Sequence, residues 1–248
     1  MGRLSGKKCV VTGGARGIGY AIGVAFAREG ANVAVLDRDG VSASRAATEL
    51  RGSGANSFAL TVDVAIEESV MSVLAEAEQT LGGIDVLVNN AGIDTHSAVV
   101  KMTTGMWDDM MAVNLRSVFL CSRAVLPGMI RQNWGRIINI SSQLAHKGAA
   151  DMAHYAAAKA GIVGFTRSLA YEVIRDGVTV NAICPGPIDT DMYQANSEAW
   201  RKRKLHELPI GRAGRVEEVA PTAVLLASDE GSYYVGATLN PNGGDVMI

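Results

Sequence analysis

The sequence predicts an α/β protein whose single domain is a doubly wound sheet of seven mainly parallel strands, with helices on both faces. Three observations lead to this expectation. Short runs rich in β-branched residues alternate with longer segments of helical pattern. The chain has 248 residues, which fits one α/β unit of the larger kind. The sequence has no low-complexity linker, charge block or fixed-period repeat, so we place no domain boundary within 1–248.

The strands are expected where the apolar runs are short and bounded by turn residues. They cover residues 9–11, 32–36, 58–62, 84–88, 136–140, 178–183 and 238–240. The helices are expected in the intervening segments, which are long enough for the crossover connections of a parallel sheet. They cover residues 17–29, 41–51, 67–81, 107–131 and 152–175. This repeated order of strand, helix and strand is typical of a doubly wound sheet.

Composition and charge indicate a compact soluble protein and exclude two classes of partner. Hydrophobic residues make up 48% of the chain and charged residues 19%, which is too apolar for a disordered chain. The formal net charge of −2 provides no field that would attract nucleic acid or an anionic membrane. The three cysteines form no close pair, and no apolar run approaches the roughly 18 residues of a membrane span. We therefore expect a cytoplasmic protein without disulfides.

The first strand leads directly into a glycine-rich turn and an Ala-rich helix. The turn reads Thr12-Gly13-Gly14-Ala15-Arg16-Gly17-Ile18-Gly19. Glycines in this context let the backbone approach a pyrophosphate, whose charge then meets backbone N–H groups and the positive end of the helix dipole. The spacing G-x-x-x-G-x-G differs from the general dinucleotide fingerprint, so on the glycines alone an ordinary structural turn is the alternative.

An acidic residue at the end of the second strand adds a cofactor preference. Asp37 lies eighteen residues beyond Gly19. A carboxylate at this position can accept hydrogen bonds from an adenosine ribose, and it repels a 2′-phosphate. We therefore expect NAD as the cofactor. NADP is the alternative, because Arg16 and Arg38 are close in sequence and can pair with a 2′-phosphate.

A tyrosine, a lysine and a serine form a candidate catalytic group. Tyr155 and Lys159 are four residues apart in a helical segment, which places both side chains on one helix face. An ammonium close to a phenol favours the phenolate and lowers a pKa that is ordinarily about 10. The strand 136–140 ends in Ser141 and Ser142 at the carboxyl edge of the sheet, where open α/β sheets bind their ligands. Each feature alone has a purely structural alternative, as an ordinary helix face or a polar strand end.

Taken together, these residues resemble the short-chain dehydrogenases/reductases in their compact form of about 250 residues. The resemblance covers nearly the whole chain, from about Leu4 to Gly244. The motifs follow one another in the family's order. They are Thr12-Gly13-x-x-x-Gly17-x-Gly19, Asp63, Asn89-Asn90-Ala91-Gly92, Asn114, Ser142, Tyr155, Lys159, and Pro185-Gly186 with Thr190. One departure is Asn242, where many relatives carry Asp, and it affects only a turn.

The resemblance implies a Rossmann-type sheet and a catalytic role for several residues. Tyr155 would act as acid and base, Ser142 would hold the substrate oxygen, and Lys159 would bind the nicotinamide ribose and lower the pKa of the tyrosine. The family's spacing of thirteen residues before the tyrosine selects Ser142 over Ser141. Asn114 would help to hold a water in a proton path to Lys159. The mechanism implied is hydride transfer with Tyr155 moving the proton, without a metal.

The resemblance also extends the cofactor site. It implies that Asp63 and Val64 contact adenine, that Asn90 lines the cofactor cleft, and that Ile188 and Thr190 hold the carboxamide. The full set of expected cofactor-binding residues is Gly13, Arg16, Gly17, Ile18, Gly19, Asp37, Arg38, Asp63, Val64, Asn90, Ala91, Gly92, Tyr155, Lys159, Pro185, Gly186, Ile188 and Thr190. The four histidines are scattered without ligand spacing, so no metal site is expected.

The function expected is an NAD(H)-dependent oxidoreductase that interconverts a secondary alcohol and a ketone. One alternative is an NADP(H)-dependent reductase of 3-oxoacyl thioesters carried on acyl carrier protein or coenzyme A, which Arg16, Arg38 and the basic run 201–204 would suit. An alternative of another class is a non-catalytic dinucleotide-sensing protein, which would be free to lose Ser142, Tyr155 or Lys159. Pocket shape decides the substrate, its stereochemistry and the direction of reaction, so the sequence does not predict them.

Two expectations concern the surface of the molecule. The segment 191–208 is expected to cover the substrate as a mobile lid, and its run Arg201-Lys202-Arg203-Lys204 is expected to form a solvated helix face. The Ala-rich helix surface at 156–164 and the apolar strand after Val235 lie where relatives assemble. By that resemblance we expect a homotetramer, with a dimer as the alternative.

Overall fold

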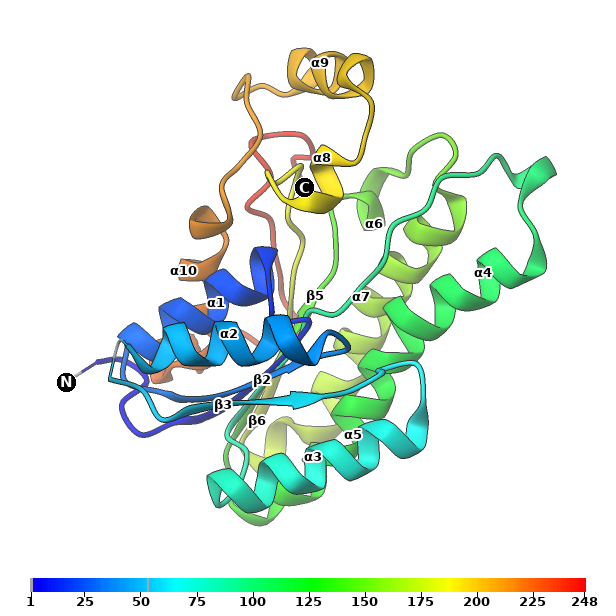
Figure 1. The fold of residues 1–248 in the computed structure, drawn as a ribbon. Helices are drawn as coiled ribbons and strands as arrows, with labels where there is room; N and C mark the ends of the chain where they lie inside the picture. Colours follow the sequence, from blue (N-terminus) through cyan, green and yellow to red (C-terminus); the bar gives the residue numbers. More distant parts are fainter. Residues whose placement is uncertain (1, 53) are drawn as a thin grey trace.

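The computed structural model describes residues 2–52 and 54–248, and in this part of the chain a seven-stranded sheet lies between two layers of helices (Figure 1). The strand order is β3-β2-β1-β4-β5-β6-β7, and every neighbouring pair is parallel. The strands are β1 (Lys8–Thr12), β2 (Asn32–Asp37), β3 (Ser57–Thr61), β4 (Val86–Asn89), β5 (Gly135–Ile140), β6 (Val178–Ile183) and β7 (Thr238–Leu239). The predicted fold class is confirmed.

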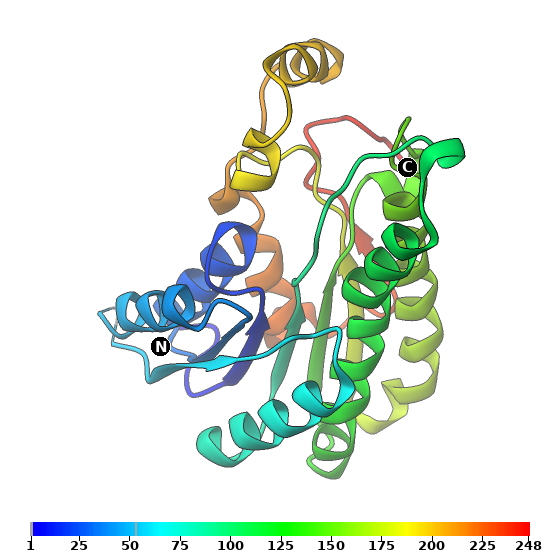
Figure 2. The same ribbon diagram turned by 45° about the vertical axis from the view of Figure 1, so that its right-hand side comes forward.

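The helices divide between the two faces of the sheet (Figure 2). They are α1 (Gly17–Arg28), α2 (Gly40–Arg51), α3 (Glu67–Leu81), α4 (Thr104–Met111), α5 (Ser117–Arg131), α6 (Leu144–Lys147), α7 (Ala153–Val173), α8 (Asp191–Gln194), α9 (Glu198–Glu207) and α10 (Ala220–Ala227). Helices α1, α2 and α10 pack on one face, where Ile22, Phe26 and Leu50 are fully or almost fully buried. Helices α3, α5 and α7 pack on the other face. The protein therefore has two apolar cores separated by the sheet.

The boundaries of the predicted elements lie close to those observed, except on the α5 side, and α10 was not among the helices predicted. The strand at 178–183 and the helix at 67–81 begin and end as predicted. The single helix predicted over 107–131 is instead α4 and α5, joined by a π-helical turn at Ala112–Arg116. Such a turn inserts one extra residue into the helical ladder and often marks a functional site. The buried Asn114 lies in it.

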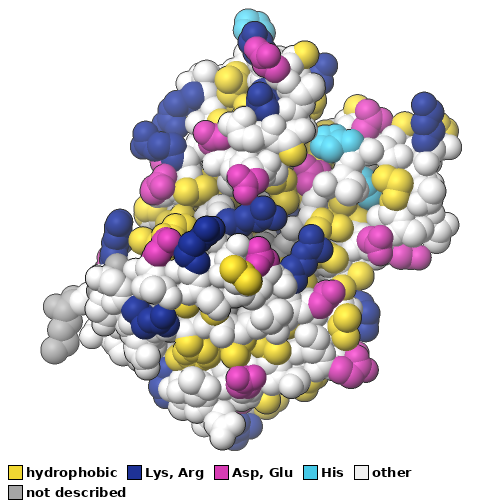
Figure 3. All heavy atoms as spheres, viewed as in Figure 1, with side chains coloured by type: hydrophobic (Ala, Val, Ile, Leu, Met, Phe, Trp, Pro, Cys, Tyr) yellow, Lys and Arg dark blue, Asp and Glu magenta, His cyan; other side chains and the backbone are white. Residues whose placement is uncertain are grey.

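The topology places the ends of the strands where a site is expected. The parallel strands put all their carboxyl ends on one edge, and the winding reverses between β1 and β4. Helix α9 stands apart from the layers above this edge (Figures 1 and 2). On the face seen in Figure 3, basic and acidic side chains are interspersed with small apolar patches. No helix in the described part of the chain combines the length and the apolar character needed to cross a bilayer.

Candidate active site

A cavity of about 1220 Å³ opens at the carboxyl edge of the sheet. It brings together nearly all of the residues singled out in the sequence, from segments far apart in the chain. Those on its wall are Gly13, Arg16, Gly17, Ile18, Asp37, Arg38, Asp63, Val64, Asn90, Ala91, Gly92, Asn114, Ser142, Tyr155, Lys159, Pro185, Gly186, Ile188 and Thr190. Gly19 does not line the cavity.

The glycine turn after β1 is shaped by close backbone packing. Gly13 and Gly17 have φ angles of +62° and +57°, which favour glycine. A Cβ on Gly19 would lie 2.3 Å from the carbonyl oxygen of Gly13 and 2.4 Å from Nδ2 of Asn90, so Gly19 makes room for its neighbours. Asn90 Nδ2 in turn donates to the carbonyl oxygens of Thr12 (3.0 Å) and Gly13 (2.9 Å). These contacts hold the turn against β4.

The turn and the start of α1 fit the pyrophosphate of a dinucleotide. Arg16 occupies the N-cap position, but its side chain makes no capping hydrogen bond. The first N–H groups of α1 therefore keep their capacity to bind an anion, and the helix dipole favours one there. Thr190 lies opposite, because a Cβ on Gly17 would be 3.5 Å from its Cγ2 atom. The cavity thus has a glycine cradle on one wall and the loop after β6 on the other.

Asp37 is fixed on the cavity wall at the end of β2. Its Oδ2 accepts a hydrogen bond from the N–H of Ala15 at 3.2 Å, and its Oδ1 accepts one from the N–H of Asp39 at 3.1 Å. Arg16 pairs with Asp191, the first residue of α8, at 3.2 Å, with about three-quarters of each side chain exposed. Arg38 is exposed. The wall at this end of the cavity therefore includes two carboxylates, Asp37 and Asp63, together with Arg16 and Arg38.

Tyr155 and Lys159 lie on α7 and face the cavity. The Nζ atom of Lys159 is 5.6 Å from the centre of the tyrosine ring and donates to the carbonyl oxygen of Ile140 at 2.9 Å. Burial lowers the pKa of Lys159 to about 8. Burial and the charge of Asp94 raise the pKa of Tyr155, while Ser142 opposes them. The expected lowering of the tyrosine pKa by Lys159 is not found here, because desolvation of the buried phenol dominates.

Ser142 and Asn114 complete the group. Ser142 is 7% exposed, and its Oγ accepts a hydrogen bond from the N–H of Leu144 at 3.1 Å. Asn114 binds the backbone of Ile93 in both directions, accepting at 3.1 Å and donating at 3.0 Å. A Cβ on Gly92 would meet Asn114 Oδ1 at 2.6 Å and Lys159 Nζ at 3.7 Å, so the asparagine and the lysine lie near each other beside this glycine.

Several polar residues of the site were not foreseen from the sequence. Asp94 lines the cavity with its side chain 13% exposed, and burial raises the pKa of this carboxyl. Its place in the loop after Asn90 is a signal that sequence reasoning could have used.

Lys204 corrects the expectation of a solvated basic run. Its side chain is only 10% exposed and pairs with Asp245, whereas the side chains of Lys202 and Arg203 are solvated as predicted. The pairing depends on a segment 41 residues away.

Known proteins match this chain over nearly its whole length. A family model described as Enoyl-(Acyl carrier protein) reductase matches residues 13–245. The 3-oxoacyl-[acyl-carrier-protein] reductase FabG of Pseudomonas aeruginosa is 44% identical over 98% of this chain and 99% of its own length. The protein of the same name from Vibrio cholerae is 43% identical over 99% of both. A crystal structure described as a short-chain alcohol dehydrogenase from Sinorhizobium meliloti superposes with a TM-score of 0.94 at 36% identity, covering 98% of this chain and 97% of that one.

Proposed function

Because the chain belongs to the short-chain dehydrogenase/reductase family, we propose that it reduces the 3-oxo group of acyl thioesters to a secondary alcohol, with NADH as the hydride donor. Membership makes the chain an NAD(P)-dependent oxidoreductase. The observation that carries the proposal is the convergence of the glycine turn with Ser142, Tyr155 and Lys159 on one cavity. The relatives named 3-oxoacyl-[acyl-carrier-protein] reductase support the substrate class. This substrate class is the alternative considered from the sequence, and it replaces the general alcohol and ketone interconversion that was expected first.

The cofactor would lie along the wall formed by the ends of β1, β2 and β4. Its pyrophosphate would be held by the glycine turn and the start of α1, and its adenosine ribose by Asp37. Asp63 and Val64 would contact the adenine, and Ile188 and Thr190 the carboxamide. When bound, the nicotinamide supplies the hydride for the reduction.

The protein's own part of the reaction is to hold the carbonyl oxygen and to deliver a proton. Ser142 would donate a hydrogen bond to that oxygen, which gains negative charge as the carbonyl carbon is reduced. Tyr155 would then transfer its phenolic proton to the same oxygen. The raised pKa of Tyr155 keeps its phenol protonated at neutral pH, as a proton donor must be. Lys159 would return a proton to the tyrosine between turnovers, and Asn114 would help to hold a water in the proton path that resupplies Lys159.

The preference for NADH rests on the electrostatics around Asp37. A 2′-phosphate would have to lie beside this carboxylate, which opposes it by direct repulsion. Arg16 would have to leave Asp191 in order to offset that repulsion. Arg38 is the remaining cation at this end of the cavity. NADPH therefore meets more opposition than NADH.

We also propose that α8 and α9 act as the lid over the substrate. Met192, Tyr193 and Trp200 line the cavity from this segment. The two aromatic rings pack edge to face, with centroids 6.0 Å apart. They would exclude water from the reacting carbonyl, which strengthens the polar contacts around it.

The test combines binding with turnover. Nicotinamide fluorescence of the purified protein is titrated with NADH and with NADPH, and then the oxidation of the tighter-binding cofactor is followed with acetoacetyl-coenzyme A. We expect tighter binding of NADH and thioester-dependent oxidation of it. Tighter binding of NADPH would reverse the cofactor assignment, and absence of thioester turnover with either cofactor would reject the substrate class.

A further inference from the structure

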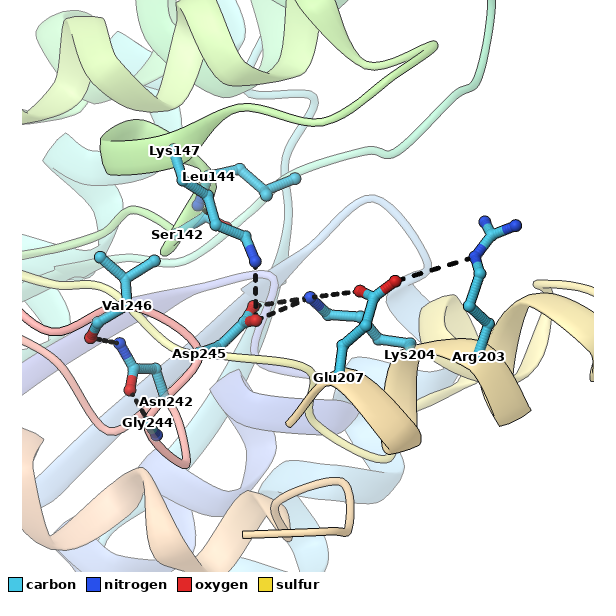
Figure 4. Close-up of polar contacts among 10 residues, drawn as sticks. All are labelled: Ser142, Leu144, Lys147, Arg203, Lys204, Glu207, Asn242, Gly244, Asp245 and Val246. Carbon is cyan, nitrogen blue, oxygen red and sulfur yellow. Dashed lines mark hydrogen bonds and ion pairs between the residues drawn. The ribbon is translucent and has the colours of Figure 1, made fainter. Parts of the chain in front are cut away.

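Two lysines from different segments share one carboxylate at the substrate end of the cavity (Figure 4). Lys147 ends α6, and its Nζ lies 2.6 Å from Oδ1 of Asp245. Lys204, on α9, lies 2.8 Å from both oxygens of the same carboxylate. The contact joins three parts of the site, because α6 follows Ser142, α9 belongs to the lid, and Asp245 lies in the carboxyl-terminal loop.

The loop around Asp245 is held in shape by Asn242. The amide of this residue donates to the carbonyl oxygen of Val246 at 2.7 Å and accepts from the N–H of Gly244 at 2.9 Å (Figure 4). The N–H of Asp245 donates to the carbonyl oxygen of Asn242 at 3.2 Å. A carboxylate at position 242 could accept but not donate, so the asparagine suits this turn. Asp245 is thereby presented to the lysines with its side chain only 3% exposed.

The charges around this carboxylate do not balance. Lys204 also lies 3.7 Å from Glu207, which is in turn 4.0 Å from Arg203, so three cations face two carboxylates. Among the described residues, Asp245 is the single hydrogen-bonding and ion-pair partner of Lys147. An ammonium has three N–H donors, which leaves Lys147 with donors to spare. Its side chain is 33% exposed.

The two lysines reach the cavity, whereas the carboxylate that they share does not. Lys147, Lys204 and Arg203 line the cavity together with Glu207, whereas Asp245, the partner of both lysines, is not part of the wall. A molecule that reaches this end of the cavity therefore meets ammonium groups before it meets the carboxylate that holds them. Hydrogen bonds from an ammonium to an oxyanion are about twice as strong as those between neutral groups. Partial burial strengthens them because the local dielectric constant is lower than in water.

We propose that Lys147, with Lys204 beside it, binds an oxyanion carried by the substrate, either a carboxylate or a phosphate. The inference rests on the proposed function, because the substrate is taken to be a 3-oxo compound reduced next to Ser142. Asp245 and Asn242 are the positioning residues of this subsite, since they hold the lysines in place without lining the cavity. The subsite would make an anionic 3-oxo compound a better substrate than its neutral analogue.

The experiment compares four 3-oxobutyryl substrates at matched NADH concentration. Acetoacetate carries a carboxylate, acetoacetyl-coenzyme A carries phosphates, and the methyl ester and the N-acetylcysteamine thioester are neutral. Lys147→Gln is expected to lower kcat/KM for at least one anionic substrate about tenfold more than for its neutral partner. Comparison of acetoacetate with its methyl ester tests binding of a carboxylate, and comparison of acetoacetyl-coenzyme A with the N-acetylcysteamine thioester tests binding of a phosphate. Lys147→Arg is expected to retain the selectivity, because it retains the charge.

The control is Lys202→Gln on α9, the helix that carries Lys204; the Lys202 side chain is 76% exposed and pairs with Glu198. It is expected to leave all four values unchanged. If Lys147→Gln changes kcat/KM equally for anionic and neutral substrates, or for none of them, the subsite is rejected. The contact of Lys147 and Lys204 with Asp245 would then have a purely structural role.

A binding measurement separates failure of the subsite from failure of the proposed function. If the wild-type protein reduces none of the four compounds, the proposed function fails, and the complex with NADH is titrated calorimetrically with 3-hydroxybutyrate and with inorganic phosphate. Binding of either anion that weakens about tenfold in Lys147→Gln would uphold the subsite. Absence of binding, or equal binding by both proteins, would reject it.

Discussion

The carboxylate of Asp37 is held by the backbone N–H groups of Ala15 and Asp39, so it would meet the adenosine end of the proposed dinucleotide in a fixed position. Replacing it with serine removes the negative charge but keeps a small polar side chain. We expect the ratio of NADPH to NADH affinity to rise about 10-fold to 100-fold, as for loss of a charged hydrogen bond and of a repulsion. Fluorescence titration of both cofactors measures this ratio.

The matched control for this prediction is Glu172→Gln, which removes an exposed carboxylate at the far end of α7. Its cofactor ratio should equal that of the wild type. An unchanged ratio in Asp37→Ser would show that Asp37 does not set the preference.

The ammonium of Lys159 should give the proposed reaction a pH dependence. Burial lowers its pKa to about 8, so the charged form prevails below that pH and is lost above it. Because the proposed proton path needs the ammonium, kcat/KM for reduction should be constant near pH 7 and fall above about pH 8. Tyr155 cannot cause this decline, since its pKa is raised and it stays protonated there. Steady-state rates between pH 6 and pH 10 measure the profile.

Substitution of the same lysine checks the assignment. Lys159→Arg keeps a charge that does not titrate in this range, so its residual activity should lose the decline above pH 8. A decline at the same pH in this variant, or a flat wild-type profile, would mean that another group controls the rate.

At this scale the sequence predicted the residues whose chemistry depends on local context. The spacing of Tyr155 and Lys159 and the position of Ser142 at a strand end are visible in the chain itself. The partnership of Lys204 with Asp245 was not, because it depends on a loop folding back over 41 residues. The raised pKa of Tyr155 was also missed, since the extent of burial is a property of the packed structure.

At the scale of elements, the junction of β1 and α1 depends on Gly19, which has no side chain. A Cβ at position 19 would come within 2.4 Å of two neighbouring atoms. We expect Gly19→Ala to lower the free energy of unfolding by about 1–3 kcal/mol through overpacking. Binding of NADH should also weaken, because the displaced turn is where we propose that the pyrophosphate binds. Thermal unfolding and fluorescence titration measure the two effects.

The control is Gly105→Ala in α4, where the nearest atom to the added Cβ is Oγ1 of Thr103 at 3.9 Å. Here unfolding should change by no more than about 1 kcal/mol, since alanine is the better helix former. NADH affinity should stay as in the wild type. Equal effects of the two substitutions would contradict the packing account of the turn.

The elements themselves could be predicted well, because apolar periodicity reports directly on burial in a parallel sheet. Two exceptions are α10, which was not predicted, and the helix pair α4 and α5, which was predicted as a single helix. The apolar pattern runs through the π-helical turn at Ala112–Arg116 without a visible break. What fixes that turn is the contact between the Asn114 amide and the backbone of Ile93, which lies 21 residues earlier. A local pattern carries no information on such a contact.

For the whole molecule, the apolar surface near residues 156–164 is where we expect other copies to pack. Phe119 of α5 is 42% exposed, and its ring packs edge to face on that of Phe165 of α7, with the ring centroids 6.5 Å apart. We predict a homotetramer that Phe119→Glu dissociates into smaller species, because charges are unfavourable in a buried interface. Light scattering after gel filtration measures the mass.

The control is Val41→Glu, which changes an 84% exposed apolar side chain on α2, away from this surface. Its mass should equal that of the wild type. A monomeric wild type, or a tetramer that persists in Phe119→Glu, would contradict the assignment of this surface.

The proposed reaction depends on Tyr155 more than on any other residue, and one measurement tests it directly. The rate of NADH oxidation with acetoacetyl-coenzyme A is compared between the wild type and Tyr155→Phe, and NADH affinity is measured for both. We predict a fall in kcat of about 100-fold or more, with cofactor affinity nearly unchanged, because only the proton-transferring hydroxyl is removed. A variant that keeps wild-type turnover would contradict the mechanism.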